Sequence, residues 1–296
     1  MVLLVGDIMS SNYKVLVLGA SGMLGNAVFR FFSDSTGFDT YGTIRSRKSL
    51  SFFAADLQNQ LISDVDVENA DNLIAIMHRV KPDLVINCVG LVKQLAQAND
   101  VLSSIPINAM LPHRLAGICA LIGARLVHMS TDCVFSGAKG NYQESDFPDC
   151  YDLYGRSKLI GEVDYENAVT LRTSIIGHEI FGSRSLVDWF LSQNGQVKGF
   201  TKTIFSGLPT VEVARIIRDF VVPNVELRGL YHLSSNPISK YDLLSLIADC
   251  YGKNISILPD PSLVLDRSLN SERFRSATGF RPESWAELVL RMYNFH

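Results

Sequence analysis

A tyrosine and a lysine four residues apart, Tyr154 and Lys158 in the segment YGRSK, are spaced for acid–base chemistry. Residues four apart share one face of a helix, so the phenol and the ammonium group can reach one site. A free tyrosine, with a pKa of about 10, exchanges protons poorly at neutral pH. We expect the Lys158 cation to favour the phenolate and so to lower the pKa of Tyr154.

A second polar group comes earlier, at Ser130-Thr131-Asp132, where the predicted strand Arg125–Ser130 ends. Ligand sites of open α/β sheets gather at the carboxyl ends of the strands. Thr131 can donate a hydrogen bond to a substrate carbonyl while Tyr154 protonates the developing alkoxide. Ser130 is more often a strand-end cap. The predicted catalytic residues are therefore Thr131, Tyr154 and Lys158.

Three glycines in VLGASGMLG lie between a predicted strand and an amphipathic helix. Gly19 permits a tight turn, Gly22 lets the backbone approach a pyrophosphate, and Gly25 allows close helix–sheet packing. The helix N-terminus offers unpaired N–H groups to the anion. The spacing is GxxGxxG, one residue longer than the usual GxGxxG, and a ligand-free glycine turn is the alternative. We expect a dinucleotide site that also includes Ser21, Met23 and Leu24.

The second predicted strand, Phe38–Ile44, indicates which dinucleotide. An acidic residue at its end would hold the ribose 2′-hydroxyl of NAD. This chain has Thr43 there, followed by Arg45 and Arg47, and clustered positive charge suits a 2′-phosphate. The prediction is NADPH, with NADH possible and a merely solvated basic loop as the alternative. Asp66 and Val67, after the third strand, are expected to meet the adenine.

Short apolar runs alternate with helix-like stretches over the first two thirds of the chain. Runs that are apolar on both faces suit strands covered on both sides, as in a parallel sheet. The expected fold class is α/β, a Rossmann-type doubly wound parallel sheet with a smaller C-terminal substrate-binding domain. We assign residues 13–174, with a returning segment near 208–235, to the NADP-binding domain. Residues 175–207 and 236–296 form the smaller domain.

The composition limits which classes of binding partner the protein is expected to have. A net charge of −3 argues against nucleic acid or an anionic membrane as the main partner. The five cysteines show no metal or redox spacing, and the histidines share no ligand spacing, so we propose no metal site. We find no apolar run of roughly 18 residues and no convincing signal peptide, and expect a cytoplasmic protein.

Taken together, these motifs resemble the extended short-chain dehydrogenase/reductase family, in the branch of dTDP-4-dehydrorhamnose reductase. The likeness covers nearly the whole chain from Lys14. It rests on VLGASGMLG, INCVG, STDCVFSG, YGRSKLIGE and LRTSIIG, and continues through GLPT, YHLS and DRSLNSERFR. The resemblance implies the catalytic roles given above and a supporting role for Asn108. It places Asp132 beside a substrate sugar, and beside the cofactor it places Asn87, Cys88, Val89 and Gly90.

The chain departs from that branch in the segments that would meet substrate, among them VGLVKQ and SRSLVDWF. The substrate can therefore be dTDP-4-dehydrorhamnose or, equally, a UDP-linked 4-keto-6-deoxy sugar. Lys93, Arg184 and Arg267 are candidates for its phosphates, although each singly is more often a surface charge. Trp189 can stack on the ligand or belong to the core.

The resulting hypothesis is NADPH-dependent reduction of a 4-keto nucleotide sugar for cell-surface polysaccharide synthesis, with a homodimer possible. Two alternatives stay open. One is a nucleotide-sugar epimerase, which would hold NAD and show no net redox change. The other is a non-catalytic NADP-binding regulatory subunit, as in a homologous subunit of methionine adenosyltransferase.

Overall fold

The structure is a computed structural model that describes residues 12–92 and 99–296. Its centre is a seven-stranded sheet in which every neighbouring pair is parallel. The expected Rossmann-type sheet is confirmed. From edge to edge the strands are β3 (Leu61–Ile62), β2 (Phe38–Thr43), β1 (Tyr13–Leu18), β4 (Leu84–Asn87), β5 (Arg125–Thr131), β6 (Ala168–Thr173) and β11 (Gly229–His232).

Both faces of the sheet are buried, because successive residues of a strand point to opposite faces. Val15 and Val17 of β1 belong to one apolar core, whereas Leu16 and Leu18 belong to the other. The first core is closed by helices α1 (Met23–Ser33), α8 (Thr210–Ile216) and α11 (Trp285–Phe295); the second by α3 (Ala70–Val80) and α5 (Leu111–Ile122). This two-sided burial explains why the strands read as continuous apolar runs.

A continuous helical segment before β5 is longer than the roughly 18 residues that we expected no apolar run to reach. It comprises α4 (Val101–Ser104), the π-helical η3 (Ile105–Met110) and α5. By length and composition alone, these 22 residues could cross a membrane, with 39% of the most apolar window buried in the protein. Leu111, Leu115 and Cys119 of this segment pack in the second core. These contacts are those of a core helix lying on the sheet.

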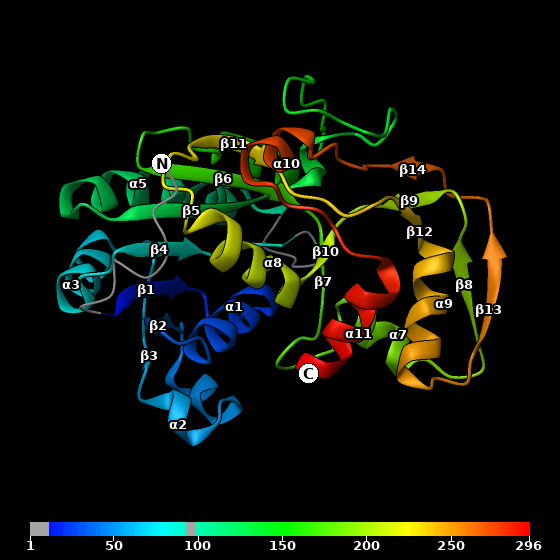
Figure 1. Cartoon of the computed structure of the whole chain (residues 1–296), viewed down its shortest axis with the longest axis horizontal. Coiled ribbons are helices and arrows are strands. Elements are labelled where there is room, and N and C mark those ends of the chain that lie inside the picture. The colour runs from blue at the N-terminus through cyan, green and yellow to red at the C-terminus, as the bar shows by residue number, and fades with distance from the viewer. Residues whose placement is uncertain (1–11, 93–98) are drawn as a thin grey trace.

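Beyond the main sheet lies a smaller lobe, which Figure 1 shows at the end of the molecule away from α3. It is built from three small sheets and the helices between them. Because β11 returns to pair with β6, the chain crosses between the lobe and the main sheet more than once. The exact domain boundaries stay a prediction. The lobe and its connections contain β7 (Ile175–Ile176), α7 (Leu186–Ser192), β8 (Gln196–Phe200), β9 (Thr203–Phe205), β10 (Leu208–Pro209), β12 (Ile238–Ser239), α9 (Lys240–Tyr251), β13 (Ser256–Asp260) and β14 (Leu265–Asp266). Helix α10 (Glu272–Thr278) lies by β11 of the main sheet, where Phe274 packs on Tyr231 (Figure 1).

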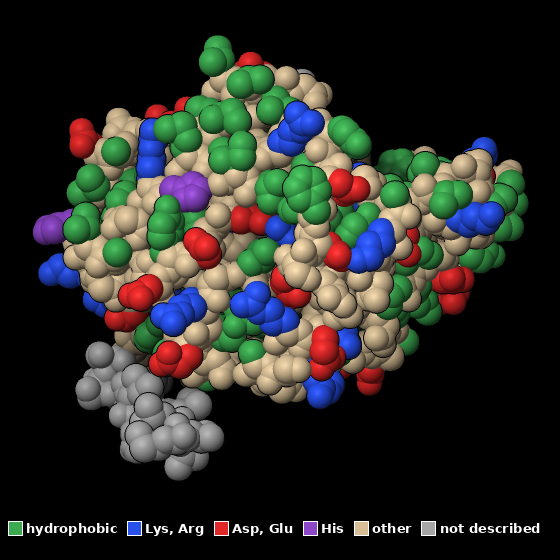
Figure 2. Space-filling model, turned by 90° about the horizontal axis from the view of Figure 1, so that it is seen from above, with side chains coloured by type: hydrophobic (Ala, Val, Ile, Leu, Met, Phe, Trp, Pro, Cys, Tyr) green, Lys and Arg blue, Asp and Glu red, His purple; other side chains and the backbone are tan. Residues whose placement is uncertain are grey.

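Short helical turns complete the description and carry several of the predicted site residues. They are η1 (Arg47–Phe52), α2 (Ala55–Gln58), η4 (Asp132–Val134), α6 (Leu153–Ile160) and η5 (Ile217–Val221). Figure 2 shows one face of the molecule, on which acidic and basic side chains are interspersed rather than separated by sign.

Candidate active site

Helix α6 carries Tyr154 and Lys158 against the end of β5. Asp152 caps the N-terminus of the helix, and its carboxylate accepts a hydrogen bond from the Gly155 amide at 2.7 Å. At Gly155 a Cβ atom would lie 2.3 Å from the carbonyl oxygen of Cys133. Only glycine therefore allows this first turn to dock on η4, and the docking brings Tyr154 to Thr131.

Tyr154 is half-buried, and its phenol lies close enough to the Thr131 side chain for that side chain to act on its pKa. Burial raises the pKa of Tyr154 above its ordinary value, and the Cys133 thiol and the Asp132 carboxylate raise it further. The Thr131 side chain lowers the pKa of Tyr154, and Lys158 is not among the main causes of the shift. Our expectation that Lys158 lowers the pKa of Tyr154 is thus wrong, because desolvation of the phenolate dominates.

The ammonium group of Lys158 donates a hydrogen bond to the Met129 carbonyl oxygen at 2.7 Å. Burial lowers the pKa of Lys158 to about 8, against the opposing effect of Glu162. A Cβ atom on Gly90 would lie 4.0 Å from the Lys158 Nζ atom. The lysine therefore faces the loop that follows β4, where the sequence placed part of the cofactor.

Thr131 and Asp132 form the floor of the site at the end of β5. The Thr131 hydroxyl donates to Asp132 Oδ1 at 3.3 Å and accepts from the Cys133 amide at 3.1 Å. Burial raises the pKa of Asp132, while Arg267 and Lys240 act in the opposite direction. The carboxylate thus lies in a partly desolvated pocket, where it feels the charge of two cations, Arg267 and Lys240.

Asn108 holds the loop after β4 against α6. Its side-chain oxygen accepts from the Leu91 amide at 2.9 Å, and its amide donates to the Leu91 carbonyl and to Ser157 Oγ, both at 3.1 Å. At Gly161 a Cβ atom would lie 2.0 Å from the Asn108 carbonyl oxygen. Asn108 therefore has the supporting geometry that the resemblance implied.

Ser130 belongs to a buried ionic network behind the site. Its hydroxyl donates to Glu162 Oε1 at 2.6 Å, and Glu162 accepts two hydrogen bonds of 2.6 Å from Arg172. Arg172 also contacts His232 at 3.2 Å. Ser130 thus anchors the strand end, which is the structural role that the sequence favoured for it.

The glycine turn has the geometry that a pyrophosphate requires. Gly19 has φ of +83°, and a Cβ atom on Gly25 would lie 2.1 Å from the Gly19 carbonyl oxygen. Gly22 caps α1 without any side-chain hydrogen bond, and the first turn holds no acidic residue. The amide groups at this helix N-terminus are therefore open to an anion, so the turn fits a dinucleotide phosphate.

Other cofactor candidates converge on this turn. Thr43 is buried, and its hydroxyl accepts a hydrogen bond from the Gly19 amide at 3.2 Å. A Cβ atom on Gly19 would lie only 3.1 Å from the Val89 Cγ2 atom, so Val89 packs closely against the turn. Burial raises the pKa of the Cys88 thiol to about 12, so it is an inert neighbour. Thr43 therefore shapes the turn, and its direct contact with cofactor stays a prediction.

The remaining cofactor candidates differ in exposure, with Arg45, Arg47 and Asp66 exposed to solvent and Leu24 buried in the first core. Exposed guanidinium groups after β2 remain available to a phosphate. The half-buried candidates are Ser21, Met23, Val67 and Gly90.

The substrate candidates separate into three groups. Arg267 is half-buried, donates to the Phe135 carbonyl oxygen at 2.8 Å and acts on Asp132, so the structure brings it to the site. Arg184 is exposed on the loop before α7, where its amide is bound by Glu179. Lys93 lies outside the described residues. Trp189, on α7, has an exposed fraction of 37%.

Lys240 was missed by the sequence reading. It is the first residue of α9, and it acts electrostatically on Asp132 and Cys133. No sequence motif includes Lys240, and the sequence did not predict how the chain folds in the smaller lobe, to which this residue belongs. Its nearness to Asp132 depends on how that lobe packs against the sheet.

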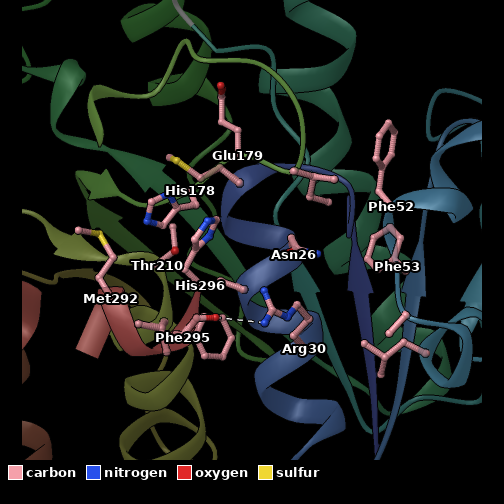
Figure 3. Close-up of a pocket in the computed structure, with 16 residues that line it drawn as sticks. Asn26, Arg30, Phe52, Phe53, His178, Glu179, Thr210, Met292, Phe295 and His296 are labelled. Carbon is pink, nitrogen blue, oxygen red and sulfur yellow. Dashed lines mark hydrogen bonds between the residues drawn. The ribbon is translucent and has the colours of Figure 1, made fainter. Parts of the chain in front are cut away.

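A separate cavity of about 330 Å³ lies along α1 (Figure 3). Asn26 and Arg30 point into it from α1, opposite His178 and His296. Of the predicted cofactor residues, only Met23 lines it. His178 is bound there by Asp188 and by Tyr251, both at 2.7 Å, and the residues that the structure describes bring together no cluster suited to a metal ion.

A family model described as "RmlD substrate binding domain" matches residues 13–294. The chain belongs to this family. The place predicted from the motifs, in the dTDP-4-dehydrorhamnose reductase branch, is thereby confirmed.

Individual relatives of this RmlD-family chain are distant. It is 25% identical to a dTDP-4-dehydrorhamnose reductase of Aggregatibacter actinomycetemcomitans, over 80% of this chain and 78% of that protein. It is 29% identical to methionine adenosyltransferase 2 subunit beta of mouse, over 80% of this chain and 72% of that protein. A Bacillus anthracis dTDP-4-dehydrorhamnose reductase, solved in complex with NADP, superimposes with a TM-score of 0.76 at 20% identity, covering 96% of this chain and 100% of that one.

Proposed function

We propose that this chain reduces the keto group of a 4-keto nucleotide sugar with NADPH. The sugar would be dTDP-4-dehydrorhamnose or a UDP-linked 4-keto-6-deoxy sugar, in cell-surface polysaccharide synthesis. The observation that carries the proposal is the grouping of half-buried Tyr154 with buried Thr131 and Lys158 at the strand ends, where the glycine turn also lies. A cytoplasmic location and a homodimer are part of the proposal.

The residues divide the chemistry between them. Bound NADPH would supply the hydride that reaches the keto carbon. Tyr154 would give its phenolic proton to the carbonyl oxygen, so that ketone, hydride and proton together make one alcohol. Thr131 would donate a hydrogen bond to the same oxygen as negative charge develops on it. Because burial raises the pKa of Tyr154, the phenol is protonated at neutral pH, as a proton donor must be.

The cofactor would be held by the glycine turn and by the groups around it. The N-terminus of α1 suits the pyrophosphate, and Arg45 and Arg47 would meet the 2′-phosphate. Lys158 has ammonium protons beyond the one donated to Met129, and these would bond the nicotinamide ribose. The NADP-bound relative supports this choice, while NADH remains a second possibility.

A direct test is NADPH oxidation, followed by absorbance, against a panel of dTDP- and UDP-linked 4-keto-6-deoxy sugars. We expect turnover with at least one sugar and little with NADH. Silence across the panel with NADPH still bound would contradict the reductase. Interconversion of sugars without net oxidation would instead indicate an epimerase.

A second candidate function is that of a non-catalytic NADP-binding regulatory subunit. The similarity to the mouse methionine adenosyltransferase subunit favours it. Against it stand the intact Tyr154 and Lys158, which a purely regulatory protein would not need. Co-purification with a methionine adenosyltransferase catalytic subunit, together with silence in the turnover assay, would decide for it.

A further inference from the structure

Lys240 reaches the site from the smaller lobe, at the first residue of α9. Its ammonium nitrogen lies 4.2 Å from the centroid of the Phe205 ring. Phe205 is buried and packs on Trp285, with ring centroids 5.7 Å apart. One side of the cation is therefore a fixed aromatic wall, which holds the charge in place.

The other side of Lys240 faces the catalytic strand end. Its electrostatic partners are Asp132 and Cys133, which directly follow Thr131. The same two residues act on Tyr154. Lys240 thus borders the space in which Thr131 and Tyr154 would meet a carbonyl group.

Arg267 borders the same space. Its guanidinium group donates to the Phe135 carbonyl oxygen at 2.8 Å and to Cys133 Sγ at 3.7 Å, and it acts on Asp132. It also acts on Asp149, which is itself bound by Ser136. Arg267 is therefore partly satisfied by the protein, whereas Lys240 is not.

Within residues 12–92 and 99–296, Lys240 makes no hydrogen bond and no ion pair within 4 Å. Other lysines of the lobe differ: Lys253 donates to the Leu191 carbonyl oxygen at 2.7 Å, and Lys198 pairs with Asp260 at 3.0 Å. Lysine carries three donors, and leaving the donors of a half-buried cation without hydrogen bonds is costly. A half-buried ammonium group whose donors make no hydrogen bond to the protein, beside a reaction site, is suited to bind an anionic group of a ligand.

We propose that Lys240, assisted by Arg267, binds an anionic oxygen of the substrate. The oxygen belongs to the phosphate next to the sugar or to a carboxylate carried by the sugar. The inference rests on the proposed function, since it assumes that the sugar occupies the space beside Thr131. Asp132, which both cations affect electrostatically, would repel a misplaced anion and so restrict where the ligand's charge can lie.

The test is calorimetric titration of the full-length, NADP⁺-loaded protein, wild type against Lys240→Met. The probes are UDP-glucose, UDP-glucuronate, glucose 1-phosphate and glucose. Because a charge-assisted contact is lost, we expect the variant to bind the anionic probes about 10- to 100-fold more weakly. Lys202→Met, an exposed lysine of the same lobe, is the matched control and should bind as wild type does.

The pattern across probes identifies the anion. Dependence on Lys240 for every phosphate-bearing probe assigns the phosphate, and dependence for UDP-glucuronate alone assigns the carboxylate. Equal binding by wild type and Lys240→Met, or no binding of any anionic probe by wild type, would overturn the inference. The keto-sugar turnover assay is separate, so failure of the reductase function is recognised independently.

Lys240→Arg supplies a second readout if the methionine variant does not fold. Burial lowers the pKa of Lys240 to about 8, so its charge is present below that pH and lost above it. Anion affinity of the wild type should fall from pH 7 to pH 9, and the arginine variant, which stays charged, should fall less. Lys158, with a pKa also of about 8, is common to both proteins and cancels in the comparison. Identical pH profiles would exclude the contact.

Discussion

The Nζ atom of Lys158 lies 2.7 Å from the carbonyl oxygen of Met129 and donates a hydrogen bond to it. Met129 is two residues before Thr131 on β5, so helix α6 is tied to the strand that carries the carbonyl-binding hydroxyl. The catalytic side chains are thus positioned by one strand–helix junction. Tyr154, on the same helix, depends on this junction for its contact with Thr131.

Replacing Tyr154 with Phe should lower kcat about 10²- to 10⁴-fold, because the proton donor is lost while the ring still packs. NADPH affinity should stay nearly unchanged, since no predicted cofactor contact is removed. Steady-state kinetics and fluorescence titration with NADPH measure the two effects. Tyr151→Phe is the matched control, because Tyr151 is 83% exposed three residues earlier and should keep full activity. Full turnover in Tyr154→Phe would remove tyrosine from the mechanism.

Gly25→Ala should weaken both NADPH binding and the fold. The added Cβ atom would lie 2.1 Å from the Gly19 carbonyl oxygen, so the turn or α1 must move. Overpacking of this kind costs about 1–3 kcal/mol in the free energy of unfolding. Chemical denaturation and NADPH titration are the measurements. Gly117→Ala is the control: it is exposed within α5, nothing lies within 4 Å of its Cβ position, and it should gain about 0.5–1 kcal/mol.

The sheet was predictable because strands that are buried on both faces have continuous apolar sequences. The predicted strand Arg125–Ser130 is one residue shorter than β5, and the predicted strand Phe38–Ile44 is one residue longer than β2. The helix predicted to carry Tyr154 and Lys158 is α6, which ends at Ile160, where Gly161 packs against Asn108. Local periodicity therefore gave the elements, and tertiary contacts set their ends.

The electrostatics of the site were less predictable. Sequence spacing brought Tyr154 and Lys158 to one helix but did not reveal that burial outweighs any nearby charge at the tyrosine. Lys240 and Asp132 are 108 positions apart, and only the packing of α9 brings their charges together. Effects that depend on lobe packing leave no local signature in the chain.

Arg45→Ala combined with Arg47→Ala should change cofactor preference. Both guanidinium groups are exposed after β2, and we expect them to contact only the 2′-phosphate. Loss of these charged contacts should raise the Kd for NADPH at least about tenfold while leaving that for NADH nearly constant. Fluorescence titration with each cofactor measures the ratio, and Arg114→Ala, an exposed arginine on α5, is the control. Parallel weakening of both cofactors would mean that these arginines do not read the phosphate.

Arg172→Met should destabilise the fold although Arg172 contacts neither predicted ligand. Its side chain is 3% exposed and forms a bidentate ion pair with Glu162, itself bound by Ser130 beside Thr131. Removing one partner of a buried pair leaves an uncompensated charge and costs about 3–5 kcal/mol in the free energy of unfolding.

The matched control for that change is Arg228→Met. Arg228 pairs with Glu166 at 3.8 Å, and their side chains are 61% and 95% exposed. A solvent-screened pair contributes at most about 1 kcal/mol, so its removal should scarcely move the urea midpoint. If the two variants lost equal stability, the buried Arg172–Glu162 pair would contribute no more to the free energy of unfolding than the exposed Arg228–Glu166 pair. A large loss in Arg172→Met alone would instead identify the network as the support that fixes the end of β5, and with it Thr131, against α6.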